Sequence, residues 1–133
     1  MQNVFVYGTL RAGEINDIGA AAAKHDIAAP THIGTATIKG RLFDFGSYPG
    51  LVVDDKGVAV VGDVYEIDDA LVAVLDEIEE VYPGVEGLFR GHDVTVEIDG
   101  APVACRCYPV ERGAVVGLKE IASGDWVAHR RSR

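Results

Sequence analysis

The sequence predicts an α+β protein, built as a small and mainly antiparallel β-barrel with flanking helices. Short runs of β-branched and aromatic residues alternate with tight turn signals, which is typical of hairpin-connected strands in a sheet that curls toward a barrel. Residues 68–80 break this pattern and have the apolar spacing of an amphipathic helix. The length of 133 residues suits one domain over residues 1–133.

Six segments rich in strand-forming residues are predicted as strands: 3–7, 31–45, 51–53, 58–67, 88–98 and 102–110. Gly8 ends the first strand and begins a turn. The turn residues 54–57 predict a hairpin that pairs strand 51–53 with strand 58–67. Asp99-Gly100 predicts a second hairpin, between the last two strands.

Two helices are expected. Residues 14–24 are rich in alanine and carry an apolar stripe, and Pro30 prevents a long continuation of this helix. Residues 68–80 begin at an N-cap aspartate, Asp68, and end before Pro83 and Gly84. The basic end, residues 130–133, is expected to be a solvated tail.

Composition excludes several classes of function. The formal charge of −9 would repel phosphate backbones, so nucleic-acid binding is not expected. No uncharged run reaches the roughly 20 residues of a membrane helix, and the start lacks a basic region, so we expect a soluble, cytoplasmic protein with no membrane partner. Cys105 and Cys107 are expected to be free thiols, on one face of a strand with Arg106 opposite. The four histidines show no ligand spacing, so no metal is expected.

Glu79 is the unusual carboxylate of the helix at 68–80. On a helical wheel with Leu71 at zero, Glu79 lies at about +80°, inside the apolar arc, whereas Asp76, Glu77 and Glu80 lie outside it and should be solvated. A carboxylate against an apolar face must find hydrogen-bond donors or take a raised pKa. Periodicity leaves the alternative open that the helix end frays and Glu79 lies in water.

The turn after the first strand is the second unusual feature. Here Tyr7-Gly8-Thr9-Leu10-Arg11 follows a buried strand without the residues of a phosphate-binding loop. Successive backbone N–H groups in such a turn can hold an anion, and Gly8 would let a ligand approach the main chain closely. The alternative is an ordinary connection between a strand and a loop.

Several ordered motifs then carry a resemblance that spans nearly the whole chain. They are Val4-Phe5-Val6-Tyr7-Gly8-Thr9-Leu10-Arg11, Asn16, Gly40-Arg41-Leu42-Phe43, Tyr48-Pro49-Gly50-Leu51, Val61-Gly62-Asp63-Val64-Tyr65, Leu75-Asp76-Glu77-Ile78-Glu79 and Gly124-Asp125-Trp126. With these motifs the chain resembles the γ-glutamylcyclotransferase-like superfamily, in particular its γ-glutamylamine cyclotransferase branch.

The resemblance implies a compact barrel and release of a γ-glutamyl group as 5-oxoproline with a free amine or amino acid. This chemistry needs one proton-transferring carboxylate and a few backbone donors, so no cofactor is expected. It implies that Glu79 is the catalytic general acid/base and that Tyr7, Gly8, Thr9 and Leu10 bind the small-molecule γ-glutamyl substrate. The chain departs from the family at Glu80, where glycine is usual, in a longer segment 81–87, and at Phe89, where tyrosine is common. Because of these departures, the sequence does not indicate which amine is released from the substrate. It also does not indicate an oligomeric state.

Two other functions are considered beside the enzyme. One is a non-catalytic binding or interaction protein on the same scaffold, favoured if Glu80 or the altered segment distorts the pocket. The other is a hydrolase of the glycosidase type, which needs two facing carboxylates, whereas the other acids of the helix are expected to face water.

Overall fold

The computed structural model describes residues 2–8, 10–11, 18–46, 48–80 and 91–132, with the backbone alone at residues 78–80. The strands of this part are β1 (Gln2–Val6), β2 (Thr31–Asp44), β3 (Pro49–Val53), β4 (Val58–Ile67), β5 (His92–Ile98), β6 (Ala101–Cys107) and β7 (Lys119–Glu120). The helices are α1 (Ile18–Lys24), α2 (Asp69–Glu80) and α3 (Trp126–Ser132), and a short 3-10 helix covers Arg112–Val115.

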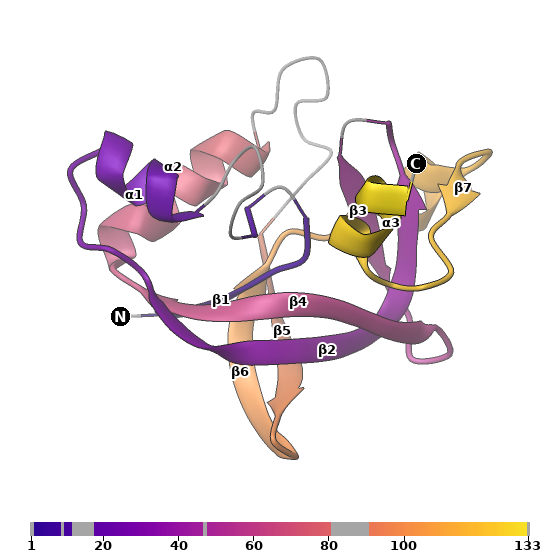
Figure 1. Ribbon diagram of the computed structural model, residues 1–133, viewed down its shortest axis with the longest axis horizontal. Coiled ribbons are helices and arrows are strands. Elements are labelled where there is room, and N and C mark those ends of the chain that lie inside the picture. Colours follow the sequence, from indigo (N-terminus) through magenta and orange to yellow (C-terminus); the bar gives the residue numbers. More distant parts are fainter. Residues whose placement is uncertain (1, 9, 12–17, 47, 81–90, 133) are drawn as a thin grey trace.

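Five strands close into a mixed barrel in the order β2, β4, β1, β6, β5 (Figure 1). The barrel closes where β5 returns to β2 and Thr37 pairs with Glu97. The pairing of β1 with β6 is parallel, and the other pairings are antiparallel. The predicted α+β fold, a mainly antiparallel barrel with flanking helices, is therefore confirmed.

Alternating side chains of the strands divide the core in two. Phe5, on β1, belongs to a cluster that contains the inward residues of all five barrel strands, together with Trp126 of α3. Its neighbours Val4 and Val6 belong to a second cluster, which contains the buried residues of α1 and α2. The strands thus have one face in the barrel interior and one face under the helices, as the period of two requires.

The two predicted helices are present and lie side by side over the barrel (Figure 1). Asp68 caps α2 through its carboxylate, which accepts a hydrogen bond of 2.8 Å from the Ala70 N–H, so the predicted N-cap is confirmed. Leu71 and Leu75 are fully buried. Of the helix expected over residues 14–24, α1 covers Ile18–Lys24, and residues 14–17 lie outside the described residues. No helix in the described part is long and apolar enough to cross a membrane.

The predicted hairpin between residues 51–53 and 58–67 is wrong, although the hairpin at Asp99-Gly100 is confirmed. β3 and β4 pair with opposite edges of β2, so Gly40 is opposite Val53 on one side and opposite Val58 on the other. Residues 54–57 therefore cross over β2. A Cβ at Gly57 would overlap the backbone of Gly40, which shows how closely the two chains approach at this crossing.

The predicted C-terminal tail is also wrong, because Trp126–Ser132 form α3. Arg130 and Arg131 are exposed, as expected of a basic end, but they belong to the last turn of this helix. Asp125 caps α3, since its carboxylate accepts the Ala128 N–H at 3.1 Å. This helix gives a weak sequence signal, because it is only two turns long and its single large buried apolar side chain is Trp126.

Cys105 and Cys107 are free and buried, and both lie in the barrel cluster on the face opposite Arg106. Burial raises the pKa of the Cys105 thiol to about 11. These thiols are therefore packing residues of the barrel wall.

Candidate active site

The turn at residues 7–10 begins where the strand ladder of β1 stops. The register with β4 ends at Val6, so the described ladder pairs do not include Tyr7, Gly8 or Leu10. The carbonyl of Gly8 accepts a hydrogen bond from the Arg11 N–H at 3.0 Å, which closes the turn. Tyr7, Gly8 and Leu10 are buried, and Thr9 lies outside the described residues.

Glycine is required at position 8 because a neighbouring side chain fills the space beside it. A Cβ built at this position would lie 2.6 Å from Cγ and 2.9 Å from Cδ of Pro49. Both are well inside normal contact, so the missing side chain makes room for the proline ring at the start of β3. Two of the motifs that carry the family resemblance, at Tyr7-Gly8 and at Pro49-Gly50, are thus in direct contact.

The hydroxyl of Tyr7 ties the turn to two other segments. It donates a 2.7 Å hydrogen bond to the carbonyl of Tyr108 and accepts a 3.2 Å hydrogen bond from the N–H of Leu51. The N–H of Val110 in turn donates to the carbonyl of Leu51 at 2.8 Å. The turn, β3 and residues 108–110 are therefore held as one unit by buried hydrogen bonds.

The prediction that Asp76 faces water is wrong, whereas Glu77 is exposed as predicted. Arg106 of β6 binds both carboxylate oxygens of Asp76, at 2.9 and 3.0 Å, and the Tyr108 hydroxyl donates to Oδ1 at 2.6 Å. The side chains of Asp76 and Arg106 are only 29% and 24% exposed. Burial raises the pKa of the Tyr108 hydroxyl, and its hydrogen bond to Asp76 raises it further, so Tyr108 is a donor at physiological pH. A helical wheel could not find this cluster, because both partners of Asp76 lie thirty or more residues away.

Glu79 lies in the last turn of α2, three residues after Asp76. Its side chain lies outside the described part of the structure, so its role as the general acid/base stays a prediction. The backbone does bring the two regions together, because Leu10 of the turn and Leu75 of α2 belong to the same buried cluster. Residues 81–90, where several departures from the family pattern occur, also lie outside the described residues.

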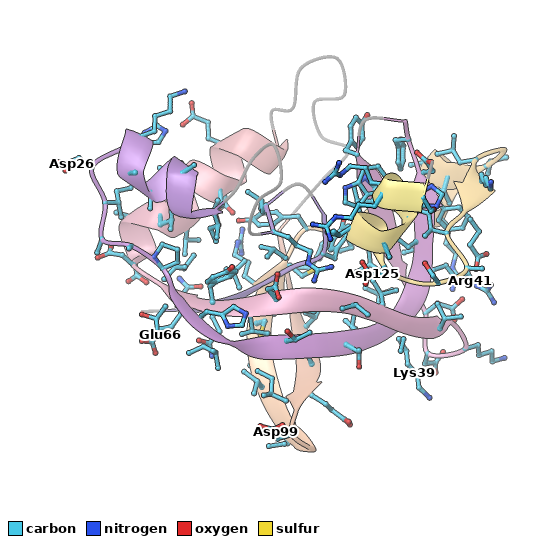
Figure 2. All side chains as sticks on the ribbon, viewed as in Figure 1. Asp26, Lys39, Arg41, Glu66, Asp99 and Asp125 are labelled. Atoms are coloured by element: carbon cyan, nitrogen blue, oxygen red, sulfur yellow. The ribbon has the colours of Figure 1, made fainter. Side chains whose placement is uncertain are left out.

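Arg11 anchors the far side of the turn. Its guanidinium donates to Asp63 of β4 at 3.1 Å and to Asp125 at 3.3 Å, and its side chain is only 14% exposed. Figure 2 shows Asp125 beside the start of α3. Three motifs that are far apart in the sequence therefore meet at one ion-pair cluster, which holds the turn against the barrel.

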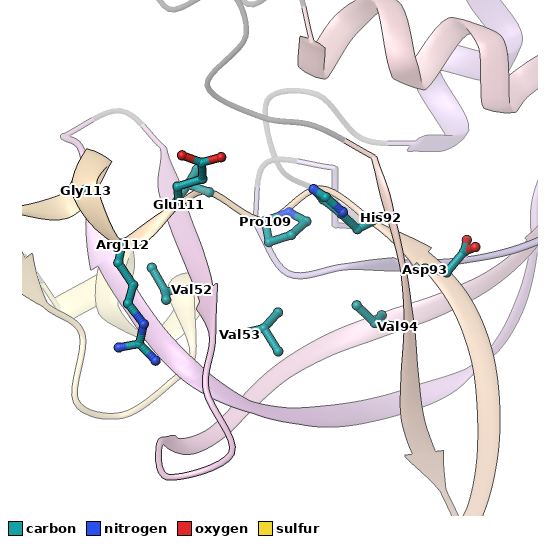
Figure 3. Close-up of a pocket in the computed structure, with 10 residues that line it drawn as sticks. Val52, Val53, His92, Asp93, Val94, Pro109, Glu111, Arg112 and Gly113 are labelled. Carbon is teal, nitrogen blue, oxygen red and sulfur yellow. The ribbon is translucent and has the colours of Figure 1, made fainter.

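An open pocket with a volume of about 630 Å³ lies between β3 and the start of β5 (Figure 3). It is lined by Val52, Val53, His92, Asp93, Val94, Pro109, Val110, Glu111, Arg112 and Gly113. None of Tyr7, Gly8 and Leu10 is among these lining residues. Within the described ranges, no group of three or more His, Cys, Asp or Glu side chains is placed to hold a metal ion.

Comparison with known proteins adds independent support for the family. Over 133 aligned residues the chain is 41% identical to γ-L-glutamyl-butirosin B γ-glutamyl cyclotransferase of Niallia circulans. The alignment covers 98% of this chain and 78% of the relative. It is 31% identical to the γ-glutamylcyclotransferase family protein YtfP of Escherichia coli K12, over 93% of this chain and 95% of the relative. Rat γ-glutamylaminecyclotransferase is 30% identical over 59% of this chain and 55% of its own length.

Solved structures show the same fold. YkqA of Bacillus subtilis superposes with a TM-score of 0.72 and 30% identity, over 99% of this chain and 43% of that chain. An AIG2-like protein of Mus musculus superposes with a TM-score of 0.73 and 24% identity, over 90% of this chain and 84% of that chain. Residues 4–128 match the family described as γ-glutamyl cyclotransferase, AIG2-like. The chain therefore belongs to the AIG2-like γ-glutamylcyclotransferase family.

Proposed function

We propose that residues 1–133 form a γ-glutamylcyclotransferase that converts a γ-glutamyl amine or γ-glutamyl amino acid into 5-oxoproline and a free amine. Glu79 is the general acid/base, and Tyr7, Gly8, Thr9 and Leu10 bind the substrate. The family and the names of the relatives indicate cyclotransferase activity. The rat relative is named a γ-glutamylaminecyclotransferase, which favours an amine leaving group.

One observation of the structure supports the proposed roles most directly. Tyr7 is hydrogen-bonded to the Tyr108 carbonyl, and the Tyr108 hydroxyl is hydrogen-bonded to Asp76, one helical turn before Glu79. This buried path joins the proposed substrate turn to the helix end that carries the proposed base. Residues that must act on one small substrate need such a fixed relation, because misplacement by about 1 Å costs a large part of the rate.

The chemistry needs one proton-transferring group and a few donors. Glu79 removes a proton from the substrate α-ammonium, and the amine nitrogen attacks the γ-carbonyl carbon of the same molecule to close a five-membered ring. N–H groups of the turn offset the charge on the carbonyl oxygen. Glu79 gives this proton to the leaving nitrogen as the bond from the γ-carbonyl carbon to that nitrogen breaks. It then takes the second proton from the nitrogen of the new ring and passes it to the free amine, which departs as an ammonium ion. Intramolecular attack supplies much of the rate by proximity.

Replacement of Glu79 by glutamine tests the proposal. Glu79→Gln keeps the shape of the side chain but cannot accept a proton, so we expect kcat to fall by about 100-fold to 10,000-fold. The readout is 5-oxoproline, measured by mass spectrometry with a panel of γ-glutamyl amines and dipeptides. Glu77→Gln is the matched control, because Glu77 is exposed on the same helix, and it should keep most of the activity.

Two outcomes would contradict the proposal. Wild-type kcat in Glu79→Gln would remove Glu79 as the base. No 5-oxoproline from any substrate of the panel, with a wild-type protein that folds normally, would favour a non-catalytic binding protein on this scaffold.

A further inference from the structure

We propose that Asp125, the residue before α3, is a positioning residue for the reaction, and that it acts by fixing the turn at residues 7–10 through Arg11. This inference rests on the proposed cyclotransferase function. It gives a role to the motif Gly124-Asp125-Trp126, which the proposed chemistry does not use.

One carboxylate oxygen of Asp125 contacts two segments of the chain. Asp125 Oδ1 accepts a hydrogen bond from the Ala128 N–H at 3.1 Å, which caps α3, and another from Arg11 Nη1 at 3.3 Å. The backbone N–H of Arg11 donates to the Gly8 carbonyl at 3.0 Å and closes the turn. Asp125 therefore links the first turn of α3 to the residue that closes the proposed substrate site.

The start of α3 is fixed to the barrel, so Asp125 has a rigid base. Trp126 is fully buried in the barrel cluster. The Gly124 carbonyl accepts the Val61 N–H of β4 at 2.8 Å. Gly124 has a φ of +69°, and a Cβ there would overlap the carbonyl oxygen of Ala59, so the chain needs glycine at this approach to β4. A shift of Asp125 would have to break these contacts.

A second contact of α3 supports the same turn from the side of β3. His129 Nε2 lies 2.8 Å from Asp44 Oδ2, and the two side chains are only 16% and 14% exposed. Asp44 ends β2 and is paired with Pro49, whose ring fills the space beside Gly8. The turn is thus bounded on two sides by segments that α3 holds.

Arg11 needs the two carboxylates that bind it to keep one orientation. Asp63 Oδ2 accepts from Nε at 3.1 Å, and Asp125 accepts from Nη1, so the planar guanidinium is held at two of its nitrogen atoms. A single carboxylate would leave the group free to rotate about that contact. The turn would then remain folded but vary in position, and a shift of about 1 Å in a group that binds substrate can cost about 100-fold in rate. Loss of the Asp125 charge alone should therefore affect catalysis more than the fold.

Asp125→Asn separates the two contacts of Asp125, because asparagine caps a helix about as well as aspartate but carries no charge for Arg11. We expect kcat/KM for γ-glutamyl substrates to fall by about tenfold, mainly through a higher KM, because the turn binds the substrate. The pH profile of kcat should keep its wild-type shape, because Glu79 is unchanged, and the melting temperature should fall by less than about 5 °C. Asp99→Asn is the matched control, because it makes the same chemical change at an exposed residue of the β5–β6 turn, far from Asp125 (Figure 2). It should leave kcat/KM unchanged.

Amide hydrogen exchange, measured by NMR, gives a readout that does not depend on activity. In Asp125→Asn the Arg11 N–H, which closes the turn, should exchange about tenfold faster, whereas the Ala128 N–H, which residue 125 still caps, should stay within about twofold. In an Arg11→Gln background, Asp125→Asn should change kcat/KM by less than about twofold, because the two residues act through one contact.

Unchanged kcat/KM in Asp125→Asn, or an equal acceleration of exchange at both amides, would overturn the inference while the cyclotransferase reaction stands. The absence of 5-oxoproline from every substrate with the wild-type protein would overturn the proposed function. Unequal exchange at the two amides would still support the contact through which Asp125 fixes the turn.

Discussion

At the scale of single residues, side chains of the family motifs form ion pairs and hydrogen bonds with other segments of the chain. Arg11 joins Asp63 and Asp125, and the Tyr7 hydroxyl joins Leu51 and Tyr108. Each contact involves a buried or largely buried group that would be costly to leave unpaired. The residues around the turn therefore maintain its shape, whatever part they take in the chemistry.

Gly8 allows a prediction at this scale. Gly8→Ala would force a Cβ against the ring of Pro49, so we expect the free energy of unfolding to fall by about 1–3 kcal/mol, measured by urea denaturation. Gly113→Ala is the control, because a Cβ at Gly113 meets nothing within 4 Å, and its effect should stay within about 0.5 kcal/mol. The sequence alone predicts that a ligand, rather than a proline, needs this space. An unchanged stability of Gly8→Ala with weaker substrate binding would support that prediction instead.

At the scale of elements, α2 is joined to the barrel by two different kinds of contact. Its apolar face packs through Leu71 and Leu75. Its C-terminal half is also held by the Asp76–Arg106 pair and by Tyr108. An apolar face alone permits small rotations of a helix, whereas a two-point contact between carboxylate and guanidinium fixes its direction.

Asp76→Asn tests whether this contact positions the end of the helix. We expect the free energy of unfolding to fall by about 1.5–3 kcal/mol, because hydrogen bonds to a charged group are lost. We also expect kcat to fall with little change in KM, because Asp76 acts through the position of Glu79 rather than on the substrate. Urea denaturation and steady-state kinetics give the two values. The exposed neighbour Glu77, changed to glutamine, should leave both near the wild-type level, and equal behaviour of the two variants would remove the positioning role.

At the scale of the whole molecule, the crossing at residues 54–57 decides the path of the chain. It carries the backbone from β3 over Gly40 to β4, so one strand is paired on both edges. Asp54 is fastened there by the Lys56 N–H, Arg41 and Arg112. Figure 2 shows Arg41 on the side of the molecule that carries α3 and β7. The hydrogen bond from the Lys56 N–H, followed by that from Arg41, lowers the pKa of Asp54 to about 2.

The shifted pKa predicts how stability depends on pH. The folded-state pKa of Asp54 lies below its ordinary value of 3.8, so its contribution is fully present above about pH 4 and is lost as the pH falls toward 2. Wild type should therefore be more stable than Asp54→Asn at pH 7, and the difference should shrink between pH 4 and pH 2. Thermal melting of both proteins across this range measures it. The exposed neighbour Asp55, changed to asparagine, serves as control, and a difference that stays constant with pH would contradict the assignment.

The sequence by itself determined the features that depend on neighbouring residues. Runs of β-branched and aromatic residues between turn signals located β1, β2, β4, β5 and β6, the Asp99-Gly100 turn joined the last two of these strands, and the apolar spacing after Asp68 located α2. The ordered motifs also identified the family. All of these signals lie within a few residues of the structure they specify, so local geometry is sufficient to express them.

Only the tertiary structure decided which distant segments meet. A turn sequence at 54–57 looks the same whether its flanking strands pair with each other or with opposite edges of a third strand. A carboxylate on the polar side of a helix looks solvated until Arg106 and Tyr108 are brought to it, and Gly8 looks open until Pro49 fills its space. Each choice depends on segments that are not neighbours in the sequence, and the partners of Asp76 and Gly8 lie thirty or more residues away. Such contacts become favourable only when the whole barrel has closed.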